Sequence, residues 1–441
     1  MNAPRSTLQA RSTPAGTLAS LFSGFEYGFA GLIVFLASGA VIMGIFRAAD
    51  QSDSGWIQIL WGVMYSITVL LIIARRRQVA RAFRLLRKDP LLLGLILYTM
   101  ASFLWAADPV LTGKRVIIFG ATTLMGVYLA VRFSLYDIAR IVGGATFCAT
   151  ILSLIVLVVA PDIGLYVDGR AIGIQGVFGN KNILGRATSL GVAMAFFLWK
   201  DPWAGRTSLW AMAFYVMFAV TLLSQSITSA LAVAVVVVLS PLLGTLRVRG
   251  KLLIPIASVT AMFLGTIIYF VLTNSKYLLT LLGRDLTLSG RLPIWGATVL
   301  LIYSNLFLGY GYGADWLNAM GDLAFLFQES FSNWEPTHAH NGFLQIGFEL
   351  GLIGLGLLVV HLLVFTARAV RWVRLNPSSY AAYIPLAFIV VLVAANLTQS
   401  TMMSRNNVYW ILYVALSLSL SNLLLARKRQ QNRSRGELDG A

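Results

Sequence analysis

Long runs of apolar residues recur along the chain and are separated by short polar segments. Each run is about 17 to 25 residues long, the length that an α-helix needs to cross the hydrocarbon core of a bilayer. We expect spans at residues 27–46, 56–74, 91–107, 116–131, 141–160, 184–199, 207–223, 230–246, 252–273, 342–365, 381–398 and 407–426. The pattern therefore predicts an all-α, polytopic membrane protein with about 12 transmembrane helices.

Basic residues mark every second loop between these spans. They gather at 75–88, 132–140, 200–206, 247–251, 368–374 and from 427 onwards. Because cytoplasmic loops carry the excess of Lys and Arg, this alternation supports the count and places both termini in the cytoplasm. The first apolar run is too long for a cleaved signal, so we expect an uncleaved anchor. We expect a cytoplasmic tail at 1–26, one transmembrane domain at 27–426 and a disordered cytoplasmic tail at 427–441.

Composition agrees with a membrane protein: 58% of the residues are apolar and 12% are charged. The net charge of +17 falls mostly in the loops assigned to the cytoplasm. It is therefore explained by the orientation of the protein in the membrane, and we expect no nucleic acid as a partner. The basic segment Arg75–Lys88 has apolar residues at helical spacing. It is either a positive-inside loop or an interfacial helix lying on anionic lipid. The single cysteine, Cys148, lies in an apolar run and excludes a disulfide within the chain.

Two long loops on the opposite side, 161–183 and 274–341, carry the candidate chemistry. Their cations stand out because loops on this side need few for topology. Neighbouring glycines let a backbone approach a ligand closely, and arginine offers a planar fork for phosphate oxygens. The pattern indicates an anion site, although each cation is also compatible with a snorkelling or loop-capping role. These cations are Arg170, Lys181, Arg186, Arg284 and Arg291.

Two of the three histidines, His338 and His340, lie where an apolar run meets the second long loop. Histidine titrates near neutral pH, so a pair at this position indicates a proton-handling site facing one compartment, whereas an isolated interfacial histidine is often a hydrogen-bonding cap. An extended segment would place the two side chains together. The third histidine, His361, lies about 30 Å of helix further on, towards the cytoplasmic side, and we expect a structural role for it.

Asn341, Gln345 and Glu349 follow the histidines at four-residue intervals. If a helix begins near Asn341, these side chains form one polar stripe that descends about 12 Å into the membrane. A carboxylate at that depth needs a partner. We expect Glu349 to orient a polar network beneath the site or to pair with an arginine of a neighbouring helix.

An ordered set of motifs is similar to that of the O-antigen ligase and polymerase superfamily over roughly residues 160–415. Within the superfamily, the chain most resembles exopolysaccharide polymerases of the succinoglycan type. The motifs are Gly-Val-Phe-Gly-Asn-Lys-Asn-Ile-Leu-Gly at 176–185, Ser-Gln-Ser at 224–226, Ser-Gly-Arg to Trp at 289–295, Gly-Tyr-Gly-Tyr-Gly to Trp at 309–316, His-Ala-His-Asn-Gly to Glu-Leu-Gly at 338–351, Asn-Leu-Thr-Gln-Ser at 396–400 and Arg-Asn to Trp at 405–410.

The resemblance implies a GT-C-like membrane glycosyltransferase that is inverting, metal-independent and free of cofactors. It would act on sugars linked to undecaprenyl pyrophosphate at the periplasmic face of the bacterial inner membrane, with long periplasmic loops. By this likeness His340 is the general base, with His338 in support, and Arg291 and Arg170 hold the pyrophosphate. The other substrate-binding residues that we expect are Lys181, Arg186, Asn180, Asn182, Asn341, Glu349 and Arg405.

Three functions fit the resemblance: a repeat-unit polymerase, a ligase that passes a finished glycan to lipid A core, and a non-enzymatic polysaccharide transporter or flippase. The ionisable residues cluster in outer loops, and no paired broken helices are indicated, which disfavours a transporter. Expected partners are the lipid-linked glycan donor and acceptor, the lipid bilayer, and chain-length regulator and export proteins. Four aromatic residues of the second loop either stack on sugars or anchor the interface: Tyr310, Tyr312, Trp316 and Trp334.

Overall fold

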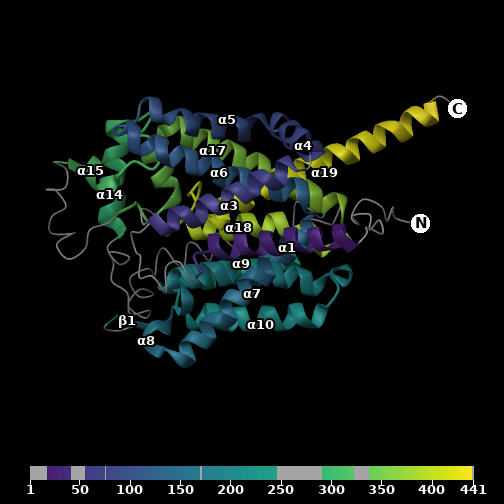
Figure 1. The fold of residues 1–441 in the computed structure, drawn as a ribbon, viewed down its shortest axis with the longest axis horizontal. Coiled ribbons are helices and arrows are strands. Elements are labelled where there is room, and N and C mark those ends of the chain that lie inside the picture. The colour runs from purple at the N-terminus through teal and green to yellow at the C-terminus, as the bar shows by residue number, and fades with distance from the viewer. Residues whose placement is uncertain are drawn as a thin grey trace.

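The computed structural model describes residues 17–40, 55–74, 76–168, 171–245, 291–321 and 337–439. Its apolar helices lie side by side along the longest axis of the molecule (Figure 1). The α-helices are α1 (Thr17–Ala37), α3 (Gly55–Ile73), α4 (Arg76–Arg87), α5 (Pro90–Ala101), α6 (Pro109–Arg132), α7 (Leu135–Val159), α8 (Pro161–Gly164), α9 (Lys181–Lys200), α10 (Thr207–Leu223), α11 (Ile227–Thr245), α14 (Arg291–Ser304), α15 (Trp316–Met320), α17 (Gly342–Leu375), α18 (Ile384–Asn396) and α19 (Val408–Asp439). Short 3₁₀ turns cover Ser102–Leu104, Gly176–Phe178, Pro202–Ala204 and Tyr380–Tyr383.

Eleven apolar helices of the described part correspond to eleven of the expected spans. Six are long and apolar enough to cross a membrane: Gly55–Ile73, Pro109–Arg132, Leu135–Val159, Lys181–Lys200, Gly342–Leu375 and Val408–Ser434. Five are shorter: Phe22–Ala37, Pro90–Leu104, Thr207–Leu223, Ile227–Val237 and Tyr380–Asn396. The remaining expected span, 252–273, lies outside the described residues. The prediction of an all-α, polytopic membrane protein is confirmed.

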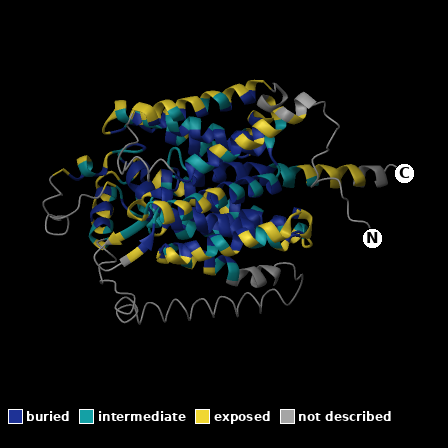
Figure 2. Cartoon of the chain, turned by 60° about the horizontal axis from the view of Figure 1, so that its bottom comes forward, coloured by how far each residue is buried: buried dark blue, intermediate teal, exposed yellow. Residues whose placement is uncertain are grey.

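Large apolar side chains cover the outside of the bundle as well as its core. Figure 2 shows buried residues along the interior and exposed ones around the periphery. Ile59, Ile117 and Val158 are each more than two thirds exposed. A water-soluble surface rarely carries apolar side chains in such density, whereas a surface in contact with lipid tails does. The periphery is therefore suited to a bilayer.

The two ends of the bundle differ in charge. α6 ends at Arg132, α9 ends at Lys200, and the last turn of α17 contains Arg374. In Figure 1 the start of α1 and the end of α19 lie at this basic end, whereas α14, α15 and β1 lie at the opposite end. The described parts of the two long loops thus belong to one end of the molecule, and the basic helix ends to the other.

The helix α17 is broken at Gly351, where the backbone turns to φ 63° and ψ −170°. The break removes helical hydrogen-bond partners on its N-terminal side. The carbonyl of Phe348 instead accepts from the Tyr310 N–H at 3.0 Å, and that of Glu349 accepts from the Gly311 N–H at 2.9 Å. An unsatisfied backbone group in a bilayer costs several kcal/mol, so the segment before α15 completes the helix.

The C-terminal side of the break is completed by the same segment. The N–H groups of Leu352 and Ile353 donate to the carbonyls of Leu306 and Phe307, at 2.8 and 3.3 Å. A side chain at Gly351 would place its Cβ 2.2 Å from the Phe307 oxygen. The sequence indicates no paired broken helices. Within the described residues α17 is broken, and the break binds the loop Leu306–Gly311 through backbone hydrogen bonds.

His361 lies in the second half of α17, within a buried polar cluster. Its Nε2 is 3.6 Å from the Asp89 carboxylate, and its Nδ1 hydrogen-bonds the Tyr413 hydroxyl. Arg368 forms an ion pair with Asp89, whose side chain is fully buried. Buried charges are stable only when paired, so this cluster fastens α17 to α19 and to the start of α5. His361 therefore has the structural surroundings that we expected.

Three local features differ from the expectations. The first helix begins at Thr17, ten residues before the expected span, and α19 continues to Asp439 where we expected a disordered tail. Arginines and lysines beyond the apolar stretch are good helix formers, so the helix propagates into the polar tail. The first outer loop contains an antiparallel hairpin of β1 (Leu165–Asp168) and β2 (Ala171–Ile174), which pairs Leu165 with Ile174.

We predict that Gly351→Ala destabilises the protein by ~1–3 kcal/mol, because the new Cβ meets the Phe307 backbone and alanine resists a positive φ. The measurement is the thermal unfolding midpoint of the purified protein in detergent. Gly356→Ala is the matched control, since nothing lies within 4 Å of a Cβ there. The control should be unchanged or slightly stabilised. Equal midpoints for both variants would contradict the structural role of the break.

Candidate active site

The two histidines lie together in a short turn immediately before α17. Their ring centroids are 4.0 Å apart, and Thr337 hydrogen-bonds the His338 ring. The turn is not extended as expected: His340 adopts a left-handed backbone with φ 48°. Asn341 then starts the helix, because its Oδ1 accepts the N–H groups of Phe343 and Leu344 at 3.0 and 3.2 Å. The expected helix start at Asn341 is confirmed.

Arg186 brings a positive charge from α9 to both histidine rings. Asn180 sets the start of α9, because its Oδ1 accepts the N–H of Asn182 at 2.8 Å. Arg186 follows in the second turn, where its carbonyl accepts from the Tyr409 hydroxyl at 3.0 Å. Its Nε is buried and has no hydrogen-bond partner among the described residues. The backbone at Arg186 is therefore fixed, while the side chain keeps a donor for a ligand.

Arg291 is the first residue of α14, and its charge acts on the His340 ring. The helix is held by an apolar cluster in which Ile294 and Leu301 lie with Phe348 of α17. Trp316 contributes a hydrogen bond from its Nε1 to the Thr298 hydroxyl at 3.1 Å. The structure thus gathers the histidine pair, Arg186 and Arg291 from three segments that are far apart in sequence.

Both histidines have depressed pKa values. Burial lowers the pKa of His340 from 6.5 to about 3, with contributions from His338, Arg291 and Arg186. Burial, then the charge of Arg186, lowers the pKa of His338 to about 4. Both rings are accordingly neutral at neutral pH. A neutral imidazole can accept a proton, and the adjacent arginines can bind an anion, so the arrangement combines a base with an anion site.

A polar network runs from the histidine turn into the bundle. The N–H of Ala339, between the histidines, donates to Gln345 Oε1 at 2.8 Å, and Gln345 Nε2 donates to Glu349 Oε1 at 2.8 Å. The Gly313 N–H also hydrogen-bonds the Glu349 carboxylate. The expected stripe of Asn341, Gln345 and Glu349 is confirmed as one face of α17, and Glu349 is its buried end.

Two arginines act electrostatically on Glu349: Arg405, which the sequence suggested, and Arg115, which it did not. Arg115 lies in α6 and donates through Nη1 to the Gly313 carbonyl. It breaks the charge bias of the outer side as the other cations do, so the same criterion would have found it. Arg405 approaches Gly313 and Glu349 and is not among the charges acting on the histidines. The arginines thus form two groups. Arg186 and Arg291 act on His340, whereas Arg405 and Arg115 act on Glu349. Gln345 connects the two places, because it hydrogen-bonds both the Ala339 N–H and the Glu349 carboxylate.

The remaining predicted residues are placed differently. Lys181 lies in the first turn of α9, with its Nζ 4.5 Å from the centre of the Tyr166 ring in β1, and Asn182 is half-buried beside it. Neither is among the groups acting on the histidine rings. Arg170, Arg284 and Trp334 lie outside the described residues.

The aromatic residues of the second loop do not form an exposed sugar platform. Tyr312 and Trp316 are 3% and 1% exposed, and the Tyr312 hydroxyl donates to the Met403 carbonyl at 2.7 Å. Tyr310 packs its ring against Phe348 at 5.1 Å. Both suggested roles for Tyr312 and Trp316, sugar stacking and interfacial anchoring, are therefore wrong: the Gly-Tyr-Gly-Tyr-Gly motif turns these rings into the core.

The Asn-Leu-Thr-Gln-Ser motif holds the start of α17. The Asn396 Oδ1 accepts the N–H groups of Thr401 and Met402 at 2.9 and 2.8 Å. A Cβ on Gly342 would lie 2.1 Å from that oxygen, so only glycine allows this approach. Asn341 adds a hydrogen bond from its Nδ2 to the Leu397 carbonyl at 3.4 Å. The motif therefore positions the histidine turn through the backbone at the start of α17.

Comparison with known proteins gives two similarities, each over part of the chain. Residues 212–359 match the family described as O-Antigen ligase, a region that contains Arg291 and the histidine turn. Over 200 residues the chain is 30% identical to the "Exopolysaccharide production protein ExoQ" of Rhizobium meliloti (strain 1021). This similarity covers 42% of the chain and 44% of that relative, so the chain spans less than half of the relative's length.

Histidine-selective NMR should detect the depressed pKa values directly, because the chain contains three histidines. We expect the His340 ring to stay neutral at pH 5, where a solvated histidine is largely protonated. Since folding lowers this pKa, the stability that the neutral ring supplies is lost as the pH falls from 6.5 towards about 3. Arg186→Gln should raise both pKa values. Titration of His340 near 6.5 in the wild-type protein would contradict the geometry.

Proposed function

We propose that this protein is a membrane glycosyltransferase that joins undecaprenyl-pyrophosphate-linked oligosaccharides into a longer polysaccharide. The observation that carries the proposal is a neutral His340 next to the cations Arg186 and Arg291. A transfer from a sugar diphosphate requires both elements: a base for the acceptor hydroxyl and positive charge for the departing diphosphate.

In the proposed reaction, a nitrogen of the His340 ring takes the proton of the acceptor hydroxyl. The acceptor oxygen then forms a bond to the anomeric carbon of the donor sugar from the face opposite the diphosphate. The bond between that carbon and the diphosphate oxygen breaks, and its electron pair leaves with the diphosphate. The configuration at the anomeric carbon is inverted. A positioned general base contributes roughly 10² to 10⁴ in rate.

Arg186 and Arg291 are proposed to hold the diphosphate. In addition to burial, their charges lower the pKa of His340, and a bound diphosphate would offset these charges and raise that pKa. Binding of the donor would therefore make His340 a stronger base for the proton of the acceptor hydroxyl. Arg170, which lies outside the described residues, is proposed as a further phosphate ligand. Lys181, Asn180 and Asn182, at the start of α9, are proposed to bind substrate as well.

Asn341, Glu349 and Arg405 are proposed to act through the network under the histidines. Gln345 connects the Ala339 N–H to the Glu349 carboxylate, and Arg405 and Arg115 compensate that buried charge. The His338 ring lies 4.0 Å from the His340 ring, tilted by 34°, and is proposed to fix its position. The absence of a metal from the reaction is also part of the proposal, with positive charge supplied by arginine.

The site is proposed to face the periplasm from the bacterial inner membrane. The ends of α6, α9 and α17 remote from the histidines are basic, and basic ends face the cytoplasm. The start of α1 and the end of α19, which lie at the same end, would then face the cytoplasm, and we propose cytoplasmic termini (Figure 1). Chain-length regulator and export proteins are natural partners of a polymerase with this orientation.

A ligase that transfers glycan to lipid A core is the second candidate. The family description O-Antigen ligase favours it, whereas the similarity to an exopolysaccharide production protein favours the polymerase. Both use the same base and the same leaving group. A transporter or flippase fits less well, because the base and arginines lie together at one end of the bundle and not at its middle.

We predict that His340→Ala abolishes glycan product, lowering the rate by at least about 10²-fold because the base is lost. The measurement is product formation by purified protein from lipid-linked oligosaccharide, resolved by gel electrophoresis. Membrane insertion and the thermal unfolding midpoint serve as controls and should match the wild type. Full activity of a folded His340→Ala protein would refute the mechanism.

We predict that Arg291→Lys is severely impaired, by about 10-fold or more, because a point charge replaces a planar fork that binds two oxygens. Arg84→Lys is the matched control, because Arg84 is an exposed arginine on α4 at the basic end and should retain activity. Turnover is measured in the same assay. Near-normal turnover of Arg291→Lys would reduce Arg291 to a packing role.

A further inference from the structure

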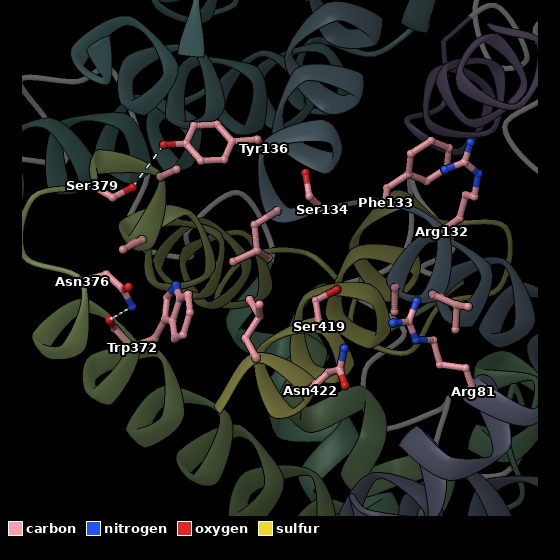
Figure 3. A pocket seen from close by; sticks show the side chains of 16 residues that line it. Arg81, Arg132, Phe133, Ser134, Tyr136, Trp372, Asn376, Ser379, Ser419 and Asn422 are labelled. Atoms are coloured by element: carbon pink, nitrogen blue, oxygen red, sulfur yellow. Dashed lines mark hydrogen bonds between the residues drawn. The ribbon is translucent and has the colours of Figure 1, made fainter. Parts of the chain in front are cut away.

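A cavity of about 200 Å³ lies at the basic end of the bundle, opposite the histidines. It is bounded by α4, the junction of α6 and α7, the end of α17 and the middle of α19 (Figure 3). Trp372 lines it, about 30 residues along α17 from the histidine turn. The part of α17 after the break, from Gly351 to Trp372, alone spans roughly 30 Å at 1.5 Å per residue. It is a separate feature of the molecule.

Several polar side chains of the cavity wall are already satisfied by the protein. The hydroxyls of Tyr136 and Ser379 both bond the Asp201 carboxylate, at 2.7 and 3.2 Å. Asn376 donates to the Trp372 carbonyl at 2.9 Å. Arg132 donates through Nε to Glu26 at 2.8 Å, so that its charge is partly compensated. These groups shape the cavity and leave little capacity for a ligand.

A second set of polar side chains is not satisfied in the same way. The Ser419 hydroxyl is buried, in a residue 6% exposed, and has no hydrogen-bond partner among the described residues. Figure 3 shows Arg81 and Asn422 next to Ser419 on one side of the cavity. A buried hydroxyl without a partner costs roughly 1–3 kcal/mol, and a group that accepts a hydrogen bond from Ser419 would recover that cost.

The chemistry of this set matches a phosphate group. Arg81 supplies a guanidinium, Ser419 a hydroxyl and Asn422 an amide N–H, and these are donors that phosphate oxygens accept. Three carboxylates bond residues of the wall and are thereby engaged: Glu26 with Arg132, Asp137 with Ser134, and Asp201 with Tyr136. The site therefore offers positive charge and hydrogen-bond donors to an anion.

The helix that provides Arg81 points to a lipid as the source of that phosphate. α4 contains five arginines and also Phe83, whose side chain is 64% exposed. A basic helix with an exposed aromatic residue beside apolar spans is suited to the interface of an anionic membrane. Of the two interpretations of Arg75–Lys88, the structure gives a helix over Arg76–Arg87.

We propose that this cavity binds the phosphate headgroup of an anionic phospholipid, with Arg81, Ser419 and Asn422 as its ligands. The binding is independent of the proposed glycosyl transfer. It would fix α4 against α6 and α19 at the basic end of the bundle.

The test is lipid titration of the detergent-solubilised protein, followed by native mass spectrometry. The probes are short-chain phosphatidylglycerol, the matching diacylglycerol without phosphate, and inorganic phosphate. Arg81→Gln should weaken phosphatidylglycerol binding by about tenfold, and Ser419→Ala should weaken it in the same direction. Arg84→Gln is the matched control: it removes the same charge from the same helix outside the cavity, and should change the affinity by less than about twofold. Thermal unfolding midpoints verify that each variant is folded.

Each outcome decides the proposal. Selective loss in Arg81→Gln and Ser419→Ala supports the site. Equal losses in Arg81→Gln and Arg84→Gln would show a general charge effect and overturn it. Binding of diacylglycerol as tight as that of phosphatidylglycerol would also overturn it. If inorganic phosphate binds as tightly as the lipid and is lost in the same variants, the phosphate chemistry stands and the lipid as its source is refuted.

Discussion

The requirement that every backbone group in a bilayer be hydrogen-bonded governs this structure at the break of α17. Gly351 interrupts the helix, and the segment Leu306–Gly311 takes over the hydrogen bonds on both sides. This repair fixes the loop that leads to Gly313, whose N–H bonds Glu349 and whose carbonyl accepts from Arg115. The polar network below the histidines therefore depends on a defect in the helix that carries them.

The same arrangement explains how a base and several cations coexist. Burial, with the charges of the nearby arginines, lowers the pKa of His340, so the ring is neutral at neutral pH. The buried carboxylate of Glu349 acts on the second group of arginines, Arg405 and Arg115, and leaves Arg186 and Arg291 facing the histidine turn. Separation of the cations into two groups makes one set available for an anionic substrate and commits the other to structure.

The two ends of the bundle carry different polar chemistry on one apolar frame. At one end, loops and helix starts meet around the histidines. At the other, helix ends rich in arginine surround the cavity at Ser419, and the cluster of Asp89, His361 and Arg368 fastens α17 internally. Charged groups in the apolar frame are paired, whereas those offered to ligands lie at its ends.

The sequence by itself determined whatever depends on neighbouring residues. Apolar runs set the spans, Asn180 and Asn341 set two helix starts, and four-residue spacing set the stripe from Asn341 to Glu349. The roles of the motifs in catalysis stay predictions. Tertiary structure alone decided that Arg186, over 150 positions from the histidines, acts on both rings, that Tyr312 and Trp316 are buried, and that Gly351 breaks its helix. The spacing of residues in the sequence predicts which face of a helix a residue occupies. Packing between distant segments decides which residues that face contacts.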